Sequence, residues 1–188
     1  MADPNNSKPE VPNGIILVSG PSRGGKSRWA EHLLSAEETV TYVATSAPRS
    51  NDPSWDKRIH LHRERRPLHW QLREPGSKLA ECIRREEANQ PLLIDALGGF
   101  TALHLDRNDL QWEQEVEELI QSLLSRTRPT VIVVEETGWG VVPATKIGGL
   151  FRDRQGWLAQ RLEQHSADSW LVIQGRAINL SQLGVLVP

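Results

Sequence analysis

Short apolar runs alternate along this chain with longer segments whose apolar positions recur at a helical period. The runs are rich in β-branched residues and are bounded by turn or polar residues, which predicts buried β-strands. They cover residues 15–19, 39–44, 91–94, 130–134 and 170–174. The longer segments have the length and spacing of helices. They cover residues 27–34, 77–89, 110–125 and 151–163.

This alternation predicts an α/β fold with a mostly parallel sheet, helices on both faces and a single domain. Ligands of such sheets gather at the carboxyl ends of the strands. Each predicted strand is followed there by a residue suited to a turn or to polar contacts. These residues are Gly20, Thr45, Asp95, Glu135 with Glu136, and Gly175. We therefore expect the functional site at this edge of the sheet.

Composition places the chain among compact intracellular proteins. Its 188 residues are 38% hydrophobic, enough for one core. We expect residues 1–13 to be a disordered leader and 14–188 to form a nucleotide-binding domain. The net charge of -2 argues against a protein that coats nucleic acid, and the single cysteine excludes an intramolecular disulfide framework. No apolar stretch approaches the roughly 18 residues that span a bilayer, so we expect a cytoplasmic protein.

The most specific motif follows the first predicted strand and has the pattern G-x-x-x-x-G-K-S. It consists of Gly20, Pro21, Ser22, Arg23, Gly24, Gly25, Lys26 and Ser27. Such a loop curls so that backbone N–H groups point at phosphate oxygens, while its lysine reaches the outer phosphates and its hydroxyl binds Mg²⁺. A strand before it and a helix after it match the context of a P-loop NTPase. The alternative is a glycine-rich turn without a ligand.

Residues 57–73 are strongly basic in a chain that is slightly acidic overall. The segment contains Lys57, Arg58, Arg63, Arg65, Arg66 and Arg73, with the histidines His60, His62 and His69. One interpretation is a solvated helix face, and a second is a nucleic-acid patch. A third is an arm over the triphosphate, because a neutral imidazole is a competent nucleophile toward phosphorus and arginines neutralise the charge that develops.

Six blocks in register between residues 14 and 175 resemble one known family. The first is ILVSGPSRGGKSRWAE (16–31) and the second is YVATS (42–46). The third combines an R-I-x-x-H pattern ending at His62 with Arg66, Pro67 and Trp70, and the fourth is Asp95 at a strand end. The last two are ETGWGVVP (136–143) and FRD (151–153) with Gly156 and Gln160. Together they resemble the bifunctional adenosylcobinamide kinase and adenosylcobinamide-phosphate guanylyltransferase of cobalamin biosynthesis.

The resemblance implies a transferase with two activities. It would phosphorylate adenosylcobinamide and then transfer GMP from GTP to the product, through a guanylylated histidine, giving adenosylcobinamide-GDP. The family pattern assigns the nucleophile to His62, with His60 as the alternative, and Lys26 is the second catalytic residue. The implied cofactors are GTP, ATP and Mg²⁺. The implied partners are the small-molecule substrate and further copies of the chain, with no nucleic acid and no membrane.

The resemblance also implies the nucleotide contacts. Beyond the phosphate loop, the nucleotide would contact Ala44, Thr45, Ser46, Arg63, Glu64, Arg65, Arg66, Glu74 and Asp95. Independently of the resemblance, the motif makes Ser27 a Mg²⁺ ligand, with Asp95 or Glu136 orienting the metal or its waters, because a carboxylate after a core strand supplies a second metal contact. Alternatively, Asp95 and Glu136 only cap the turns that follow them.

The chain departs from the family pattern beyond the phosphate loop. A D-C-L-T-x-W block becomes residues 95–100, with Gly98 in place of the hydroxyl residue, and an N-E-V-G block begins with Glu135. These departures keep two alternatives open. One is a P-loop kinase or nucleotidyltransferase for another small molecule, and the other is a non-catalytic nucleotide-binding module.

Overall fold

A computed structural model describes residues 9–46, 60, 66–140 and 142–187 of the chain. Its strands form one sheet in the order β3-β2-β4-β5-β1-β6-β7. The strands are β1 (Ile15–Gly20), β2 (Thr41–Ala44), β3 (Gln71–Arg73), β4 (Leu92–Asp95), β5 (Thr130–Glu135), β6 (Ser166–Ile173) and β7 (Arg176–Asn179). Neighbouring strands pair in parallel except β6 and β7, which are antiparallel. The predicted mostly parallel sheet is confirmed.

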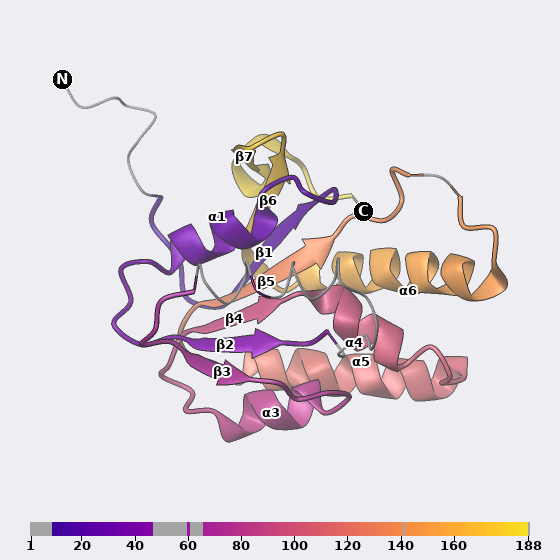
Figure 1. Ribbon diagram of the computed structural model, residues 1–188, viewed down its shortest axis with the longest axis horizontal. Coiled ribbons are helices and arrows are strands. Elements are labelled where there is room, and N and C mark those ends of the chain that lie inside the picture. The colour runs from indigo at the N-terminus through magenta and orange to yellow at the C-terminus, as the bar shows by residue number, and fades with distance from the viewer. Residues whose placement is uncertain (1–8, 47–59, 61–65, 141, 188) are drawn as a thin grey trace.

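Helices cover both faces of this sheet, as predicted (Figure 1). They are α1 (Lys26–Leu33), α3 (Leu79–Arg85), α4 (Leu97–Leu103), α5 (Asp109–Leu124), α6 (Lys146–Glu163) and α7 (Leu180–Leu183). One face packs against α1, and the opposite face packs against α3, α4, α5 and α6. In the described part of the chain, no helix is both long enough and apolar enough to cross a membrane.

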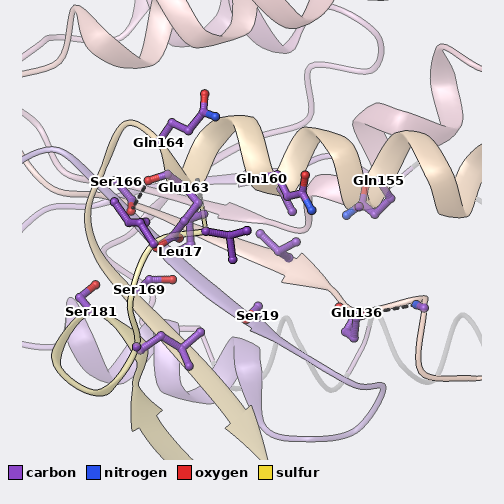
Figure 2. A pocket seen from close by; sticks show the side chains of 18 of the residues that line it. Leu17, Ser19, Glu136, Gln155, Gln160, Glu163, Gln164, Ser166, Ser169 and Ser181 are labelled. Carbon is purple, nitrogen blue, oxygen red and sulfur yellow. Dashed lines mark hydrogen bonds between the residues drawn. The ribbon is translucent and has the colours of Figure 1, made fainter.

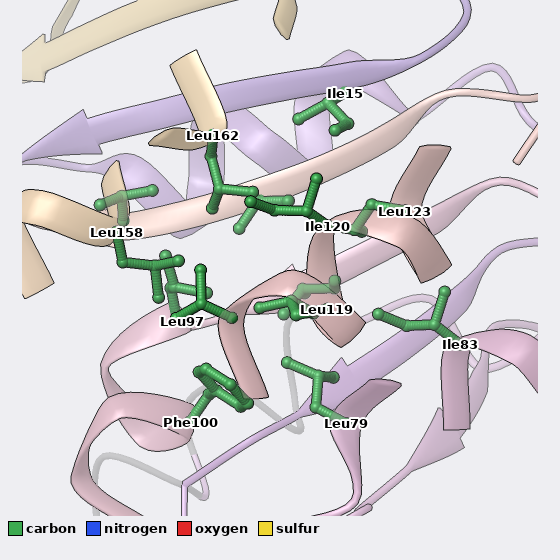
Figure 3. Packing of buried hydrophobic residues seen from close by; sticks show 14 of the residues in the cluster. Ile15, Leu79, Ile83, Leu97, Phe100, Leu119, Ile120, Leu123, Leu158 and Leu162 are labelled. Carbon is green, nitrogen blue, oxygen red and sulfur yellow. The ribbon is translucent and has the colours of Figure 1, made fainter. Parts of the chain in front are cut away.

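Two apolar cores follow from strands that are buried on both faces. In β1, Ile15 and Leu17 face the larger core, while Ile16 and Val18 face the smaller one under α1. This division gives the unbroken apolar run that is typical of parallel strands. The larger core joins the four helices α3, α4, α5 and α6, with Phe100, Leu119 and Leu158 among its buried residues (Figure 3). The sheet is therefore a rigid base for the loops at its carboxyl edge.

The structure adds elements that the sequence pattern did not reveal. The strands β3 and β7 and the helix α4 were not predicted, and the last predicted helix begins earlier, at Lys146. Thr145 explains that start, because its side chain accepts a hydrogen bond from the N–H of Gly148 and caps the helix. The last predicted strand is the second half of β6, which begins at Ser166.

Candidate nucleotide-binding site

The phosphate loop leaves β1 and turns directly into α1. Gly20 and Gly25 have positive φ angles of 145° and 110°, which favour glycine. The loop also packs closely on β6, since a Cβ on Gly20 or Gly24 would lie 2.2 or 2.5 Å from the carbonyl oxygen of Val172. Gly25 caps α1 without a side-chain hydrogen bond, so the first N–H groups of α1 are left to a ligand.

Lys26 and Ser27 hold the positions that the motif predicts. Lys26 is largely buried, and its Nζ donates a hydrogen bond of 2.8 Å to the carbonyl of Pro21, across the curl of the loop. The Ser27 hydroxyl donates to Oδ1 of Asp95 at 3.2 Å. The other carboxylate oxygen of Asp95 accepts a hydrogen bond of 2.6 Å from the Tyr42 hydroxyl. Residues from β1, α1, β2 and β4 thus meet at one edge of the sheet.

The pair of Ser27 and Asp95 has the donor chemistry that Mg²⁺ needs. Both supply oxygen, and hard oxygen ligands are those that Mg²⁺ prefers. Among the described residues, no group of three or more histidine, cysteine or acidic side chains is arranged around a common metal position.

Glu135 is a site residue that the sequence analysis placed at a strand end without giving it a binding or catalytic role. It lies at the end of β5, opposite Gly20 in the register of the two strands. Its Oε2 accepts a hydrogen bond of 2.8 Å from the N–H of Gly98 and a longer one of 3.5 Å from Gln155. Burial raises the pKa of this carboxyl, and the charge of Asp95 also raises it, whereas the Gly98 hydrogen bond and Lys26 oppose the rise. The signal in the sequence was the extra carboxylate at the end of a core strand.

Glu136 lies in a different environment from its neighbour. Its N–H donates to the carbonyl of Gly20 at 2.9 Å, while its carboxylate accepts a 2.5 Å hydrogen bond from the N–H of Gly138. The side chain therefore braces the turn after β5, which is the alternative role considered above. Its assignment as a metal ligand stays a prediction.

The remaining predicted contacts fall into three environments. Thr45 is buried, and its hydroxyl donates to the carbonyl of Ala96, which joins β2 to the start of α4. Ala44 and Ser46 are half-buried beside it, and Ala44 pairs with Asp95 in the sheet. The guanidinium carbon of Arg66 lies 5.1 Å from the centroid of the Tyr42 ring, and Tyr42 is the residue whose hydroxyl donates to Asp95. Glu74 is exposed and lines a small hollow with Arg73 and Cys82.

The predicted nucleophile is not among the described residues. His62, Arg63, Glu64 and Arg65 all lie outside them, and His60 is exposed. The structure thus brings together the phosphate loop, Asp95 and Glu135, and it leaves the role of the basic segment as a prediction.

Comparisons with known proteins identify close relatives by sequence. The family model described as cobinamide kinase / cobinamide phosphate guanyltransferase matches residues 16–180. The bifunctional adenosylcobalamin biosynthesis protein CobU of Escherichia coli is 32% identical over 181 residues, covering 88% of this chain and 99% of that protein. The bifunctional adenosylcobalamin biosynthesis protein CobP of Pseudomonas aeruginosa is 36% identical over 151 residues, covering 79% and 86%.

Solved structures with little sequence similarity share the fold. A protein from Pyrococcus horikoshii OT3 has a TM-score of 0.52 at 8% identity, covering 92% of this chain and 88% of that one. An ATPase from a bacterial type III secretion system also has a TM-score of 0.52, at 12% identity, covering 93% of this chain and 59% of that one. At these identities the likeness concerns the fold alone.

Proposed function

This chain belongs to the cobinamide kinase / cobinamide phosphate guanyltransferase family, and from that premise we propose how its residues carry out the two reactions. Membership makes it a transferase of cobalamin biosynthesis that acts on cobinamide and then on cobinamide phosphate. The observation that supports a working catalytic site is the contact of Ser27 with Asp95 beside Lys26. We take adenosylcobinamide as the acceptor and ATP or GTP as the phosphate donor.

In the kinase step, the acceptor hydroxyl oxygen attacks the γ-phosphorus and the bond from that phosphorus to the bridging β-oxygen breaks. The nucleoside diphosphate leaves and the hydroxyl proton passes to water. The N–H groups of the loop and of α1 hold the β- and γ-phosphates. Lys26 moves from the Pro21 carbonyl to the phosphates and offsets the charge on their oxygens. Ser27 and Asp95 hold Mg²⁺, with Glu136 as a further candidate ligand. When bound, this ion supplies positive charge at the phosphate oxygens.

In the guanylyl step, a ring nitrogen of His62 attacks the α-phosphorus of GTP and pyrophosphate leaves. A phosphate oxygen of adenosylcobinamide phosphate then attacks the same phosphorus and releases the histidine. The products are adenosylcobinamide-GDP and free enzyme. Arg63, Arg65 and Arg66 neutralise the developing charge, and imidazole suits this relay because it is both a nucleophile and a leaving group.

GTP labelled at its α-phosphate tests the covalent step. The wild-type protein should acquire label that acid removes and base does not, as expected for a phosphoramidate, and cobinamide phosphate should discharge it. His62→Ala should abolish the label, while His60→Ala should retain it. Label that persists in His62→Ala and disappears in His60→Ala would transfer the role to His60.

The setting of the enzyme is part of the proposal. We place it in the cytoplasm, where its nucleotides are made, and expect a homo-oligomer in which residues 57–73 lie near a neighbouring subunit. Light scattering coupled to size-exclusion chromatography measures the mass directly. A mass of one chain, 21.1 kDa, would contradict the oligomer.

A further inference from the structure

A large cavity lies beside the nucleotide site, on the face of the sheet that α6 covers. Its volume is about 740 Å³, and its walls are α6, the strands β1 and β6, and the C-terminal segment 180–187 (Figure 2). One end reaches Ser19 and Glu135. Ser19 directly precedes Gly20, and Glu135 lies opposite Gly20 in the sheet, so this end adjoins the start of the phosphate loop.

The lining of the cavity combines apolar residues with polar side chains that stand on the sheet face. Most strand positions on this sheet face are apolar, as at Ile132 outside the cavity and at Leu17 and Val134 in its wall. In the cavity, Ser19 and Ser169 occupy such positions on the adjacent strands β1 and β6. Gln160 of α6 is a further lining residue, and Figure 2 shows it with Ser19 and Ser169 around the space. Neutral donors and acceptors on a sheet face are suited to a ligand with hydrogen-bonding groups of its own.

The charge of the lining distinguishes this ligand from the nucleotide. Glu135, Glu136 and Glu163 line the cavity, and Arg152 is its one basic residue among those described. Arg152 is also engaged by Asp153, to which its guanidinium donates at 2.9 Å. An acidic cavity repels phosphates and favours a neutral or cationic molecule.

We propose that this cavity is the acceptor subsite of the kinase step and takes the carboxamide-bearing edge of the cobinamide macrocycle. The inference rests on the proposed function and specifies where its acceptor binds. Peripheral amides of the macrocycle match glutamine and serine side chains, and an adenosylated cobalt(III) corrin carries a net positive charge that suits the acidic lining. The apolar residues Leu180, Val185 and Leu186 supply a wall for its hydrocarbon surface.

The position of the cavity also suits the chemistry. A macrocycle edge held between α6 and β6 leaves its side arm free to extend past Ser19 and Glu135. The arm's terminal hydroxyl then approaches the start of the phosphate loop, where Lys26 donates to the carbonyl of Pro21. In loops of this type the lysine reaches the β- and γ-phosphates. The C-terminal segment gains a function in this arrangement, as a wall of the acceptor subsite.

Steady-state kinetics with cobinamide and ATP test the subsite. Gln160→Leu and Ser169→Leu each remove a polar group and fill part of the cavity. We expect either change to raise the KM for cobinamide about tenfold, equivalent to about 1.4 kcal/mol, and to leave the KM for ATP within about twofold. Gln114→Leu, which changes an exposed glutamine of α5, is the matched control and should alter neither value.

Equilibrium dialysis with cobinamide separates the failure of the subsite from the failure of the proposed function. If the wild-type protein shows no turnover, the proposed function fails, and weaker cobinamide binding by Gln160→Leu would still support the subsite. If both cavity variants bind and turn over cobinamide like the wild type, the subsite is wrong. A change of oligomeric mass with an unchanged KM for cobinamide would also overturn it, because the cavity would then be a contact between copies.

Discussion

At the residue scale, Glu135 and Gly98 form a matched pair. A Cβ on Gly98 would lie 2.9 Å from both carboxylate oxygens of Glu135, so the absence of a side chain at 98 makes room for the carboxylate. The Gly98 N–H then donates to it. Both positions depart from the family pattern, and the structure shows that the two departures belong to one contact. Neither departure disturbs the contact of Ser27 with Asp95.

The raised pKa of Glu135 predicts a pH-dependent stability. Because the native carboxyl holds its proton more tightly than the unfolded one, the stability that it contributes is full below the ordinary glutamate pKa of about 4.3. That contribution is lost as the pH rises through the native pKa. Glu135→Gln removes the titration, so the free energy of unfolding of the wild type should fall relative to this variant as the pH rises. Urea unfolding at a series of pH values, without metal or nucleotide, measures the difference.

A second glutamate provides a control of opposite sign. A hydrogen bond from Gln121 lowers the pKa of Glu117, and Arg161 lowers it further. Its contribution is therefore present above the ordinary glutamate pKa and lost as the pH falls through the lowered one. Relative to Glu117→Gln, the free energy of unfolding of the wild type should therefore fall as the pH falls, which is the opposite of the change expected for Glu135→Gln. Stability curves of wild type and Glu135→Gln that stay parallel over the whole range would contradict the burial argument.

At the element scale, the C-terminal hairpin is fastened by one buried carboxylate. Asp168 of β6 accepts hydrogen bonds from the N–H of Ser169 at 2.9 Å, from Nε1 of Trp170 at 2.8 Å and from the amide of Asn179 at 3.0 Å. Asn179 is the last residue of β7, and its side-chain oxygen caps α7 by accepting a hydrogen bond from the N–H of Gln182. One side chain thus joins β6, β7 and α7.

Removal of this carboxylate should destabilise the fold. Asp168→Ala leaves buried donors without a partner, and we expect it to lower the free energy of unfolding by about 3 kcal/mol. Asp106→Ala, at an exposed aspartate, should change it by less than about 0.5 kcal/mol. Chemical denaturation of both variants measures the difference. Equal stability of the two variants would show that water replaces the lost acceptor.

The helices and strands also differ in how well the sequence predicted them. The apolar runs located the central strands because parallel strands are buried on both faces. The strand β3 escaped because it has three residues, Gln71–Arg73, without a buried side chain, and α4 escaped because Gly98 and Gly99 interrupt its sequence. The contact of Ser27 with Asp95 followed from strand ends and motif spacing. Tyr42 entered the site through pairing between distant strands, which no local pattern encodes. Glu135 had a local signal, its place at the end of a core strand, but its contact with Gly98 depends on the fold.

At the scale of the whole molecule, the nucleotide site is built from four strands that the chain order keeps apart. Gly20 ends β1, Asp95 ends β4 and Glu135 ends β5, while β6 supports the phosphate loop through Val172. A ligand that contacts all of these elements binds only the folded chain. Its binding free energy therefore adds to the stability of the entire fold.

Nucleotide should consequently raise the melting temperature. At a concentration of MgGTP one hundred times its Kd, the gain is about 2.7 kcal/mol, or about 5 to 10 °C for a chain of this size. Because Lys26 and Ser27 bind the phosphates and the metal in our proposal, Lys26→Ala should reduce the shift. Ser27→Ala should remove the magnesium-dependent part of the shift in melting temperature, which is the part that EDTA abolishes in the wild type. Differential scanning fluorimetry measures each shift, and a Ser27→Ala protein with a full magnesium-dependent shift would exclude that residue as a ligand.

The place of β1 in the sheet also has a consequence for biosynthesis. Among the described strands it is synthesised before all the others, whereas its two neighbours, Thr130–Glu135 and Ser166–Ile173, follow only after β2, β3 and β4. A nascent chain therefore carries its phosphate loop without either flanking strand until β5 has been synthesised. Nucleotide can assist folding only after β6 emerges, so the earlier stages depend on the remaining strands or on chaperones.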